Sequence, residues 1–448
     1  MSLVNNITTE TQKEIEDNSN NWKNYVVIST LVWVSGNPPF RKIIVDKEIT
    51  LISILLLFSV LFFFLPKKKK SIREVGVLTL FIAIGLYHTL DGGDIVSELG
   101  HIIRISIGCL AALILGNSFR LYFIKLMTWV GTWSLLLWLI QLLDFASIFN
   151  PLLRFLSNVY GLPQGYCLLY TFMIHSNEYY RNAGIFWEPG AYAGFLCIAL
   201  MFLFSIRNSV SRSFYLYSLI LMSVSLLTTL STTGYIAFFI IIFYFMGLKN
   251  RKSTMFFILI PIVLLLSYYL YGSLSFLQNK IDIQIENTLY EKQSWQINRF
   301  GSFLFDLDYI IIKPLFGWGH NFDNMGFEIA TFKEKMGNGF SGYILKNGII
   351  GICIVLVSIY KNLKKIKIDY FPFVFVLMFC ILLQGEVFLE YPFFLALAFF
   401  SFDTPTGDAF QEEISQPVVV VVPESANCNT YGMYSSKNGT HLNRENTF

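Results

Sequence analysis

Long apolar runs follow one another along most of the chain, separated by short polar or basic segments. A helix needs about 20 apolar residues to cross the roughly 30 Å hydrocarbon core of a bilayer. Most of these runs are 15 to 23 residues long, so the pattern predicts an all-α polytopic membrane protein. Its twelve spans are expected at about 25–38, 49–65, 75–90, 102–119, 121–143, 191–206, 214–230, 233–248, 255–272, 341–360, 370–388 and 391–402.

Four basic segments predict how these spans are oriented. Cytoplasmic loops of membrane proteins carry an excess of Lys and Arg. If the spans alternate sides and the first basic segment is cytoplasmic, all four segments become cytoplasmic. They are KKKKSIR from Lys67, RNSVSR from Arg207, KNRK from Lys249 and KNLKKIK from Lys361. Both termini are then cytoplasmic, and two long external (periplasmic) loops are expected at about 144–190 and 273–340.

The chain is therefore expected to have three parts: a cytoplasmic segment at 1–24, a transmembrane domain at 25–402 and a mostly disordered cytoplasmic tail at 403–448. In the first external loop, an apolar stretch from Phe149 is interrupted by prolines and glycines. This pattern predicts an interfacial or re-entrant helix pair. The second loop mixes helical periodicity with aromatic residues, which favours a small external cap.

Composition excludes several classes of function. Hydrophobic residues make up 54% of the 448 residues, charged residues make up 14% and the mean hydropathy is +0.55, which excludes an ordinary soluble domain. A net charge of +3 does not indicate a nucleic-acid partner. The six cysteines lack CxxC spacing, and no Walker pattern is present. The acidic pairs at Asp91 and Asp306 are short patterns that are common by chance. We expect neither a bound metal nor a cofactor.

The first candidate site is the stretch YYRNAGIFWEPGAYAGF, at the outer mouth of the span at 191–206. A charge at the lip of a bilayer is costly and marks a functional-site candidate. Arg181 could hold an anion, or it could only anchor the topology. Glu188 could be a general base or could orient an arginine. Small, rigid and aromatic neighbours could admit and stack a sugar, although the aromatic residues also suit an interfacial belt. These neighbours are Tyr180, Gly184, Trp187, Pro189 and Gly190.

The second external loop adds Arg299 and His320. Two arginines on different loops could together clamp a phosphate or carboxylate, because the guanidinium fork binds such groups in a bidentate manner. His320 could act as a base or only hydrogen-bond within its loop.

Four segments in this order resemble the O-antigen polymerase and O-antigen ligase superfamily: RNAGIFWEPGAYAGF, STTGYIAFF, NRFGSFLFDLDYIIIKPLFGWGHN and GNGFSGYILKNGIIGICIV. The resemblance spans about 180–360. It implies a GT-C-like membrane glycosyltransferase that acts on undecaprenyl-pyrophosphate-linked oligosaccharide at the outer face of the bacterial inner membrane. It also implies that Arg181 and Arg299 hold donor and acceptor. With Glu188, these are our predicted catalytic residues. The predicted substrate-binding residues are Tyr180, Gly184, Trp187, Pro189, Gly190, His320 and Asn338.

One dipeptide favours the polymerase branch. Members of the ligase branch typically carry His-Asn where this chain has Gly337-Asn338. A ligase and a lipid-linked oligosaccharide flippase remain the alternatives, although the polar groups gather outside the spans rather than along a transport path. The bilayer and a chain-length regulator are the expected partners, besides the lipid-linked substrate.

Overall fold

The computed structural model describes residues 22–40, 48–63, 72–143, 145–160, 165–172, 181–245, 299–320 and 337–400. The chain divides into two units, Met1–Thr406 and Gly407–Phe448, and the second lies outside the described residues. The predicted span at 255–272, the predicted tail and most of the predicted external cap also fall outside them.

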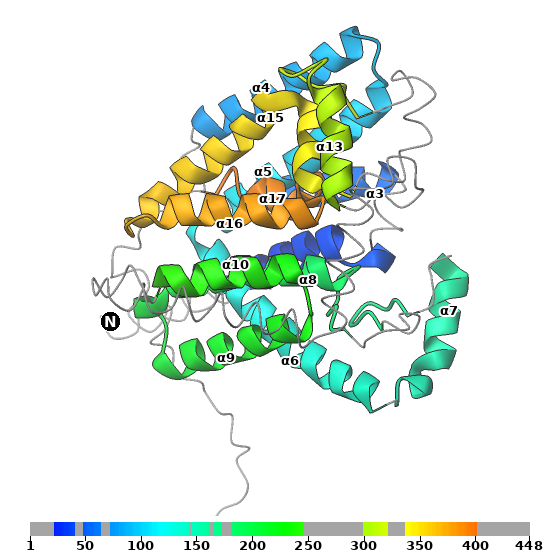
Figure 1. Ribbon diagram of the computed structural model, residues 1–448, viewed down its shortest axis with the longest axis vertical. Helices are drawn as coiled ribbons and strands as arrows, with labels where there is room; N and C mark the ends of the chain where they lie inside the picture. Colours follow the sequence, from blue (N-terminus) through cyan, green and yellow to red (C-terminus); the bar gives the residue numbers. More distant parts are fainter. Residues whose placement is uncertain are drawn as a thin grey trace, which may run out of the picture. The chain divides into compact units, whose positions relative to one another are not determined.

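Regular structure in the described chain is helical, apart from one isolated β-bridge between Tyr166 and Thr171. A helix covers 22–36. The others (Figure 1) are α3 Glu48–Phe63, α4 Ile72–Leu90, α5 Ile95–Leu115, α6 Phe119–Leu142, α7 Asn150–Tyr160, α8 Pro189–Ser205, α9 Arg212–Thr228, α10 Thr232–Phe243, α13 Arg299–Ile310, α15 Gly339–Leu363, α16 Phe371–Gly385 and α17 Pro392–Ala396.

These helices confirm the all-α prediction for the part of the chain that the structure describes. Two helical stretches, Ile95–Leu142 and Gly339–Ile366, are long and apolar enough to cross a membrane. Shorter apolar helices include α8, α9, α10 and α16. The other predicted spans, apart from the one at 391–402, remain predictions.

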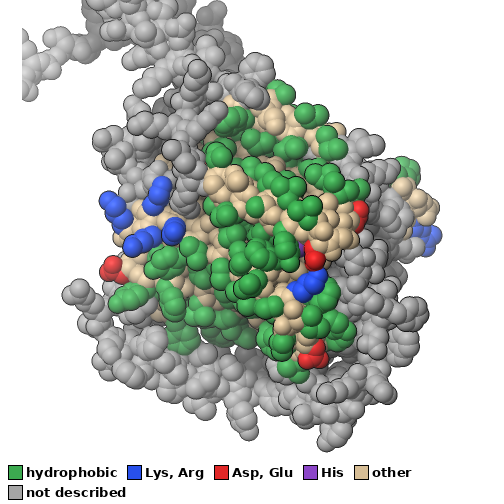
Figure 2. Space-filling view, turned by 90° about the horizontal axis from the view of Figure 1, so that it is seen from above, with side chains coloured by type: hydrophobic (Ala, Val, Ile, Leu, Met, Phe, Trp, Pro, Cys, Tyr) green, Lys and Arg blue, Asp and Glu red, His purple; other side chains and the backbone are tan. Residues whose placement is uncertain are grey.

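Several helices expose large apolar side chains. On α4, Val75, Leu80 and Leu86 are 60%, 51% and 59% exposed. Figure 2 shows apolar side chains spread over one face of the molecule, with one group of Lys and Arg at its left edge and other charged side chains at the right. Apolar surface of this extent is unusual for a soluble monomer and suits contact with lipid.

The helix α8 lies inside the protein. Every residue from Ala191 to Leu203 is buried, as expected of a helix that is apolar on all sides. It packs against α6, α9 and α10. Gly194 permits a close approach, since a Cβ there would lie 2.2 Å from the ring of Phe388. The buried helix fixes the position of the polar segment that precedes it.

Two local predictions differ from the structure. Instead of a span at 391–402, the described residues form the five-residue helix α17, and residues 391–400 are buried against α5 and other neighbours. Their apolar character reflects burial in protein. In the loop that the sequence predicts to be the first external one, α7 is followed at 165–172 by a turn with the β-bridge, rather than by the second helix of the predicted pair.

A break in α15 accommodates the loop at 311–320. Gly348 has a φ of +68°, and a Cβ there would lie 2.0 Å from the carbonyl oxygen of Leu315. The broken backbone bonds to the loop, because Ile349 N donates to Pro314 O at 2.8 Å and Trp318 N donates to Leu345 O at 2.8 Å. Glycine is required where backbones approach this closely. The described part of this loop, residues 311–320, is therefore held against α15.

Candidate active site at the ends of α8, α13 and α16

Three charged residues meet where three helices begin or end. Glu188 precedes α8 as its N-cap, Arg299 is the first residue of α13, and Glu386 follows α16 as its C-cap. Nη2 of Arg299 lies 3.1 Å from Oε1 of Glu188 and 3.0 Å from Oε1 of Glu386. The Glu188 side chain does not cap its own helix, so its carboxylate reaches across to α13. One guanidinium therefore joins two acids that are far apart in sequence.

The two acids differ in exposure and in protonation. The Glu386 side chain is only 6% exposed, whereas those of Glu188 and Arg299 are 36% and 42% exposed. Burial, together with the hydrogen bond and charge of Glu188, raises the pKa of Glu386 well above its usual range. Burial opposes ionisation of Glu188 too, but the hydrogen bond from Glu386 and the charge of Arg299 hold its pKa below the usual value. The arrangement favours an ionised Glu188 beside a neutral Glu386.

Glycines allow the backbone to pack closely around these charges. A Cβ at Gly190 would lie 2.4 Å from Oε1 of Glu386, and one at Gly339 would lie 1.9 Å from the Glu386 carbonyl oxygen. A Cβ at Gly385 would lie 3.0 Å from Nη1 of Arg299 and 2.9 Å from Oγ1 of Thr233 on α10. The sequence predicted that Gly190 allows the backbone to come close to a ligand. In the structure, the group that lies close to Gly190 is the carboxylate of Glu386.

Arg181 lies at the turn between α9 and α10. Its Nε donates to Thr229 O at 2.9 Å, and its Nη2 donates to Leu230 O at 3.1 Å. These carbonyls belong to a helix end and a residue with a φ of +49°, where the backbone lacks helical partners. Burial lowers the pKa of Arg181, while the charge of Glu188 counteracts this. Arg181 thus ties the predicted motif to the α9 end and acts electrostatically on the same acid as Arg299.

The other predicted residues of the first motif have clear positions. Nε1 of Trp187 lies 3.4 Å from Oε2 of Glu386, and its ring centroid lies 4.9 Å from that of Tyr391. Pro189 occupies the first turn of α8, where its missing N–H costs nothing. Gly184 has a φ of +57° and faces the Tyr192 ring. Trp187 thus supports an acid of the site. Tyr180 lies outside the described residues.

Asn338 and His320 occupy different surroundings. Asn338 is the N-cap of α15, and its Nδ2 donates to Gln384 Oε1 at 2.7 Å and to Arg299 O at 3.4 Å. It therefore borders the charged cluster. His320 instead contacts Glu98 and stacks on His101. The structure brings Arg299, Glu188 and Asn338 together and leaves His320 in a second cluster.

Sequence reasoning did not identify Glu386. The residue was included in the predicted span at 370–388, and no neighbouring motif marked it. The available signal was an acidic residue at the end of an apolar helix, where an unpaired charge would be costly. Its partner, Arg299, could not be inferred from spacing, because the two are 87 residues apart.

The comparisons with known proteins address part of this region. The O-antigen ligase family matches residues 217–356, which include Arg299 and most of α15 but not Arg181, Glu188 or Glu386. No curated protein matches the chain. The match agrees with the resemblance of the sequence motifs. Residues 217–356 are therefore similar to the O-antigen ligase family.

Proposed function

We propose that this chain polymerises lipid-pyrophosphate-linked oligosaccharide units into a surface polysaccharide at the outer face of the bacterial inner membrane. The observation that carries the proposal is Arg299 bonded to both Glu188 and Glu386 at the ends of apolar helices. The family match supports glycosyl transfer from lipid-linked sugars. Glu188 and Arg299 lie in the two loops that the basic-loop pattern predicts to be external, and Glu386 lies near the end of the span at 370–388 that the same pattern predicts to be external.

In the proposed reaction, a hydroxyl of the acceptor glycan attacks the anomeric carbon of the donor glycan. The new C–O bond forms as the bond from that carbon to the lipid pyrophosphate breaks, and the pyrophosphate keeps the electron pair. Glu188 takes the hydroxyl proton, because its carboxylate is ionised and partly exposed. No further energy source is needed, since the lipid pyrophosphate is an activated leaving group.

Arg299 stabilises the charge that develops on the leaving pyrophosphate. Its side chain is 42% exposed, so an incoming phosphate can reach the guanidinium. Preorganised cations at a developing negative charge lower the barrier to reaction. When Arg299 turns toward phosphate, it withdraws positive charge from Glu188, and the carboxylate becomes a stronger base. Donor binding would in this way prepare Glu188 to accept the proton. Arg181 contributes a second positive charge nearby.

Polymerase activity is favoured over ligase activity by the residues before α15. Gly337 stands where the ligase branch typically has histidine, and a Cβ there would lie 3.5 Å from Cγ of Arg299. The position thus borders the site and supplies no imidazole. A ligase remains the second candidate, because the matched family carries that description.

The test is a gel of surface glycan from a deletion strain that is complemented with wild type, Arg181→Ala or Arg299→Ala. We expect a single repeat unit in the deletion strain, a ladder with wild type and no ladder with either variant, at equal amounts of membrane protein. Long polymer retained on the carrier lipid in the deletion strain would instead identify a ligase. Lipid-linked units trapped inside would identify a flippase. Wild-type ladders from both variants would refute the assigned site.

A further inference from the structure

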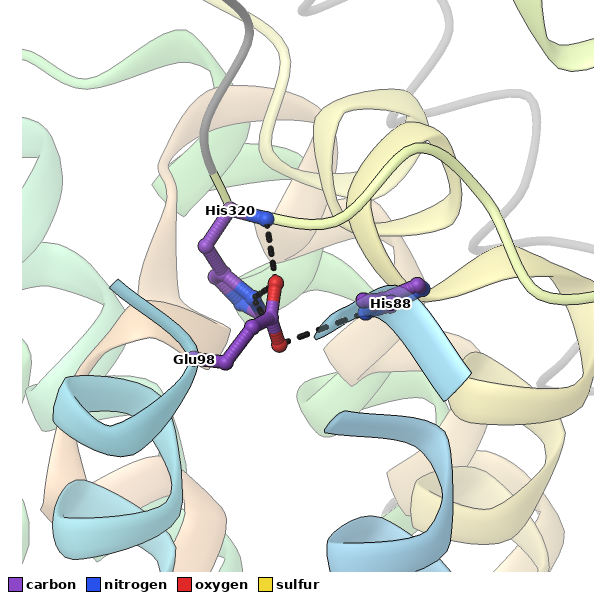
Figure 3. Close-up of side chains that lie close together, drawn as sticks. All are labelled: His88, Glu98 and His320. Atoms are coloured by element: carbon purple, nitrogen blue, oxygen red, sulfur yellow. Dashed lines mark hydrogen bonds and ion pairs between the residues drawn. The ribbon is translucent and has the colours of Figure 1, made fainter. Parts of the chain in front are cut away.

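Three side chains meet in a second cluster, away from Arg299 (Figure 3). His88 comes from the last turn of α4, Glu98 from the first turn of α5, and His320 from the end of the loop held against α15. The side chains are 1%, 4% and 9% exposed. Nothing in the proposed glycosyl transfer uses them, so the cluster needs a separate explanation.

The hydrogen bonds of His88 leave a lone pair facing a carboxylate. Its Nε2 lies 2.8 Å from the carbonyl oxygen of Phe316. A carbonyl only accepts hydrogen bonds, so Nε2 must carry the proton. In neutral His88, Nδ1 is then an acceptor, yet it lies 3.2 Å from Oε2 of Glu98. Two acceptors at this distance repel each other unless a proton on Nδ1 or a metal ion lies between them.

The third side chain completes a set of metal ligands. Nδ1 of His320 lies 3.2 Å from both carboxylate oxygens of Glu98, and the ligand atoms of the three residues all lie within 4.8 Å of one another. Nitrogen and oxygen ligands at about 2.1 Å from a tetrahedral zinc ion lie about 3.4 Å from each other. The ligand atoms therefore need to move only slightly to surround an ion.

A fourth residue supports a ligand at this place. His101 is 4% exposed and its ring centroid lies 4.0 Å from that of His320. Neither of its ring nitrogens has a hydrogen-bond partner among the described residues. Buried polar atoms are rarely left in this state. A metal ion, or a water bound to one, would satisfy one of these nitrogens. Lys346, which acts electrostatically on His320, is already paired with Glu390.

We propose that His88, Glu98 and His320 bind a divalent transition-metal ion, and that the ion fastens the loop at 311–320 to the ends of α4 and α5. Two histidines and one carboxylate are a donor set typical of Zn²⁺. The loop is bonded on its other side to the break in α15 at Gly348. The ion would therefore join α4 and α5 to α15 through this loop. The proposal does not depend on the proposed glycosyl transfer, and it replaces the expectation from spacing that the chain binds no metal.

The test uses the full chain in detergent, with an affinity tag that contains no histidine. After chelation and removal of the chelator, we expect zinc to bind at close to one ion per chain by elemental analysis and to raise the thermal midpoint. His88→Ala and His320→Ala should each abolish both effects, whereas His441→Ala, at a histidine outside the described residues, should preserve them. Cobalt added to the wild-type chain should give the visible absorption bands of a tetrahedral site, and zinc should remove them. This measurement does not require a variant to fold. Absence of zinc binding and of cobalt bands in wild type would overturn the proposal, as would undiminished zinc binding in both His88→Ala and His320→Ala.

Discussion

Glu188 and Glu386 both bond to Arg299, but replacement of each by glutamine should affect the reaction rate very differently. Glu386 is buried and its raised pKa keeps it neutral, whereas Glu188 has a lowered pKa and is ionised. In Glu386→Gln, the amide oxygen at the Oε1 position can still accept from Arg299, and the amide nitrogen at the Oε2 position can still donate to Glu188. Only the long contact of 3.4 Å from Nε1 of Trp187 is lost. We expect the rate to stay within about threefold of wild type, which corresponds to less than about 1 kcal/mol in the activation barrier.

Glu188→Gln removes the group that accepts the hydroxyl proton. General-base catalysis contributes roughly 10²- to 10⁴-fold. The activation barrier should accordingly rise by about 3 to 5 kcal/mol. The acid limb of the pH–rate profile, where the wild-type rate falls as Glu188 is protonated, should disappear from the residual activity. The change from Glu to Gln preserves shape, so the amount of protein in the membrane should match wild type.

The assay follows polymer bands over time with purified protein and lipid-linked oligosaccharide. Thermal midpoints of wild type and both variants serve as the control for folding. A Glu386→Gln enzyme without activity, beside an active Glu188→Gln enzyme, would refute this assignment of protonation and make Glu386 the base. Equal and large losses in both variants would show that the two acids act as one unit, against the reasoning given above.

Three further predictions concern packing, pH dependence and orientation. Gly190→Ala should abolish activity in the polymer assay, because its Cβ would lie 2.4 Å from Oε1 of Glu386. Gly342→Ala is the control and should retain wild-type activity, because a Cβ there meets nothing within 4 Å. Asp306 is buried, and burial raises its pKa from 3.8 to about 6, so its folded state holds the proton more tightly than the unfolded state. Stability should therefore fall as pH rises from 3.8 to about 6, by about 3 kcal/mol in total, and Asp306→Asn should lack this loss when thermal midpoints are compared across pH. To test the orientation, single cysteines are introduced into a cysteine-free chain. Leu90→Cys, at a position that is 88% exposed, should react with an impermeant maleimide in spheroplasts, whereas Lys364→Cys should react only after the membrane is opened. The reverse pattern of labelling would show that the predicted orientation is inverted.

The helices were the most predictable part of this protein. Apolar runs predicted α3 to α6 and α8 to α10 because a bilayer and a protein interior both select long apolar segments. For the same reason, the apolar residues at 391–402 were predicted to span the membrane, although residues 391–400 pack inside the protein around the short helix α17. Hydropathy does not distinguish burial in lipid from burial in protein.

The candidate site was predictable only in part. Arg181 and Glu188 stand out because they are charged residues beside a long apolar helix. Arg299 stands out as a second arginine on another predicted external loop, and the family resemblance implied its role. The roles of Glu386 and His88, and the contacts of Arg181 with the end of α9, depend on which helix ends meet in the fold. In the second cluster, His88 and His320 are 232 positions apart in the sequence. Periodicity describes each helix separately and contains no information on such pairs.

The meeting of Glu188 with Glu386 bears on the predicted topology. The positive-inside rule used only Lys and Arg in loops, and it placed the start of α8 and the end of α16 on the same, external side. The contact through Arg299 requires these ends to share a side, without any use of that rule. If α8, α9, α10, α15 and α16 each cross the membrane, they make five crossings, which would leave Glu188 and Glu386 on opposite sides. The two acids then share a side only if the number of further crossings between α10 and α15 is odd. The sequence predicts one span there, at 255–272, outside the described residues, and that prediction is consistent with this condition.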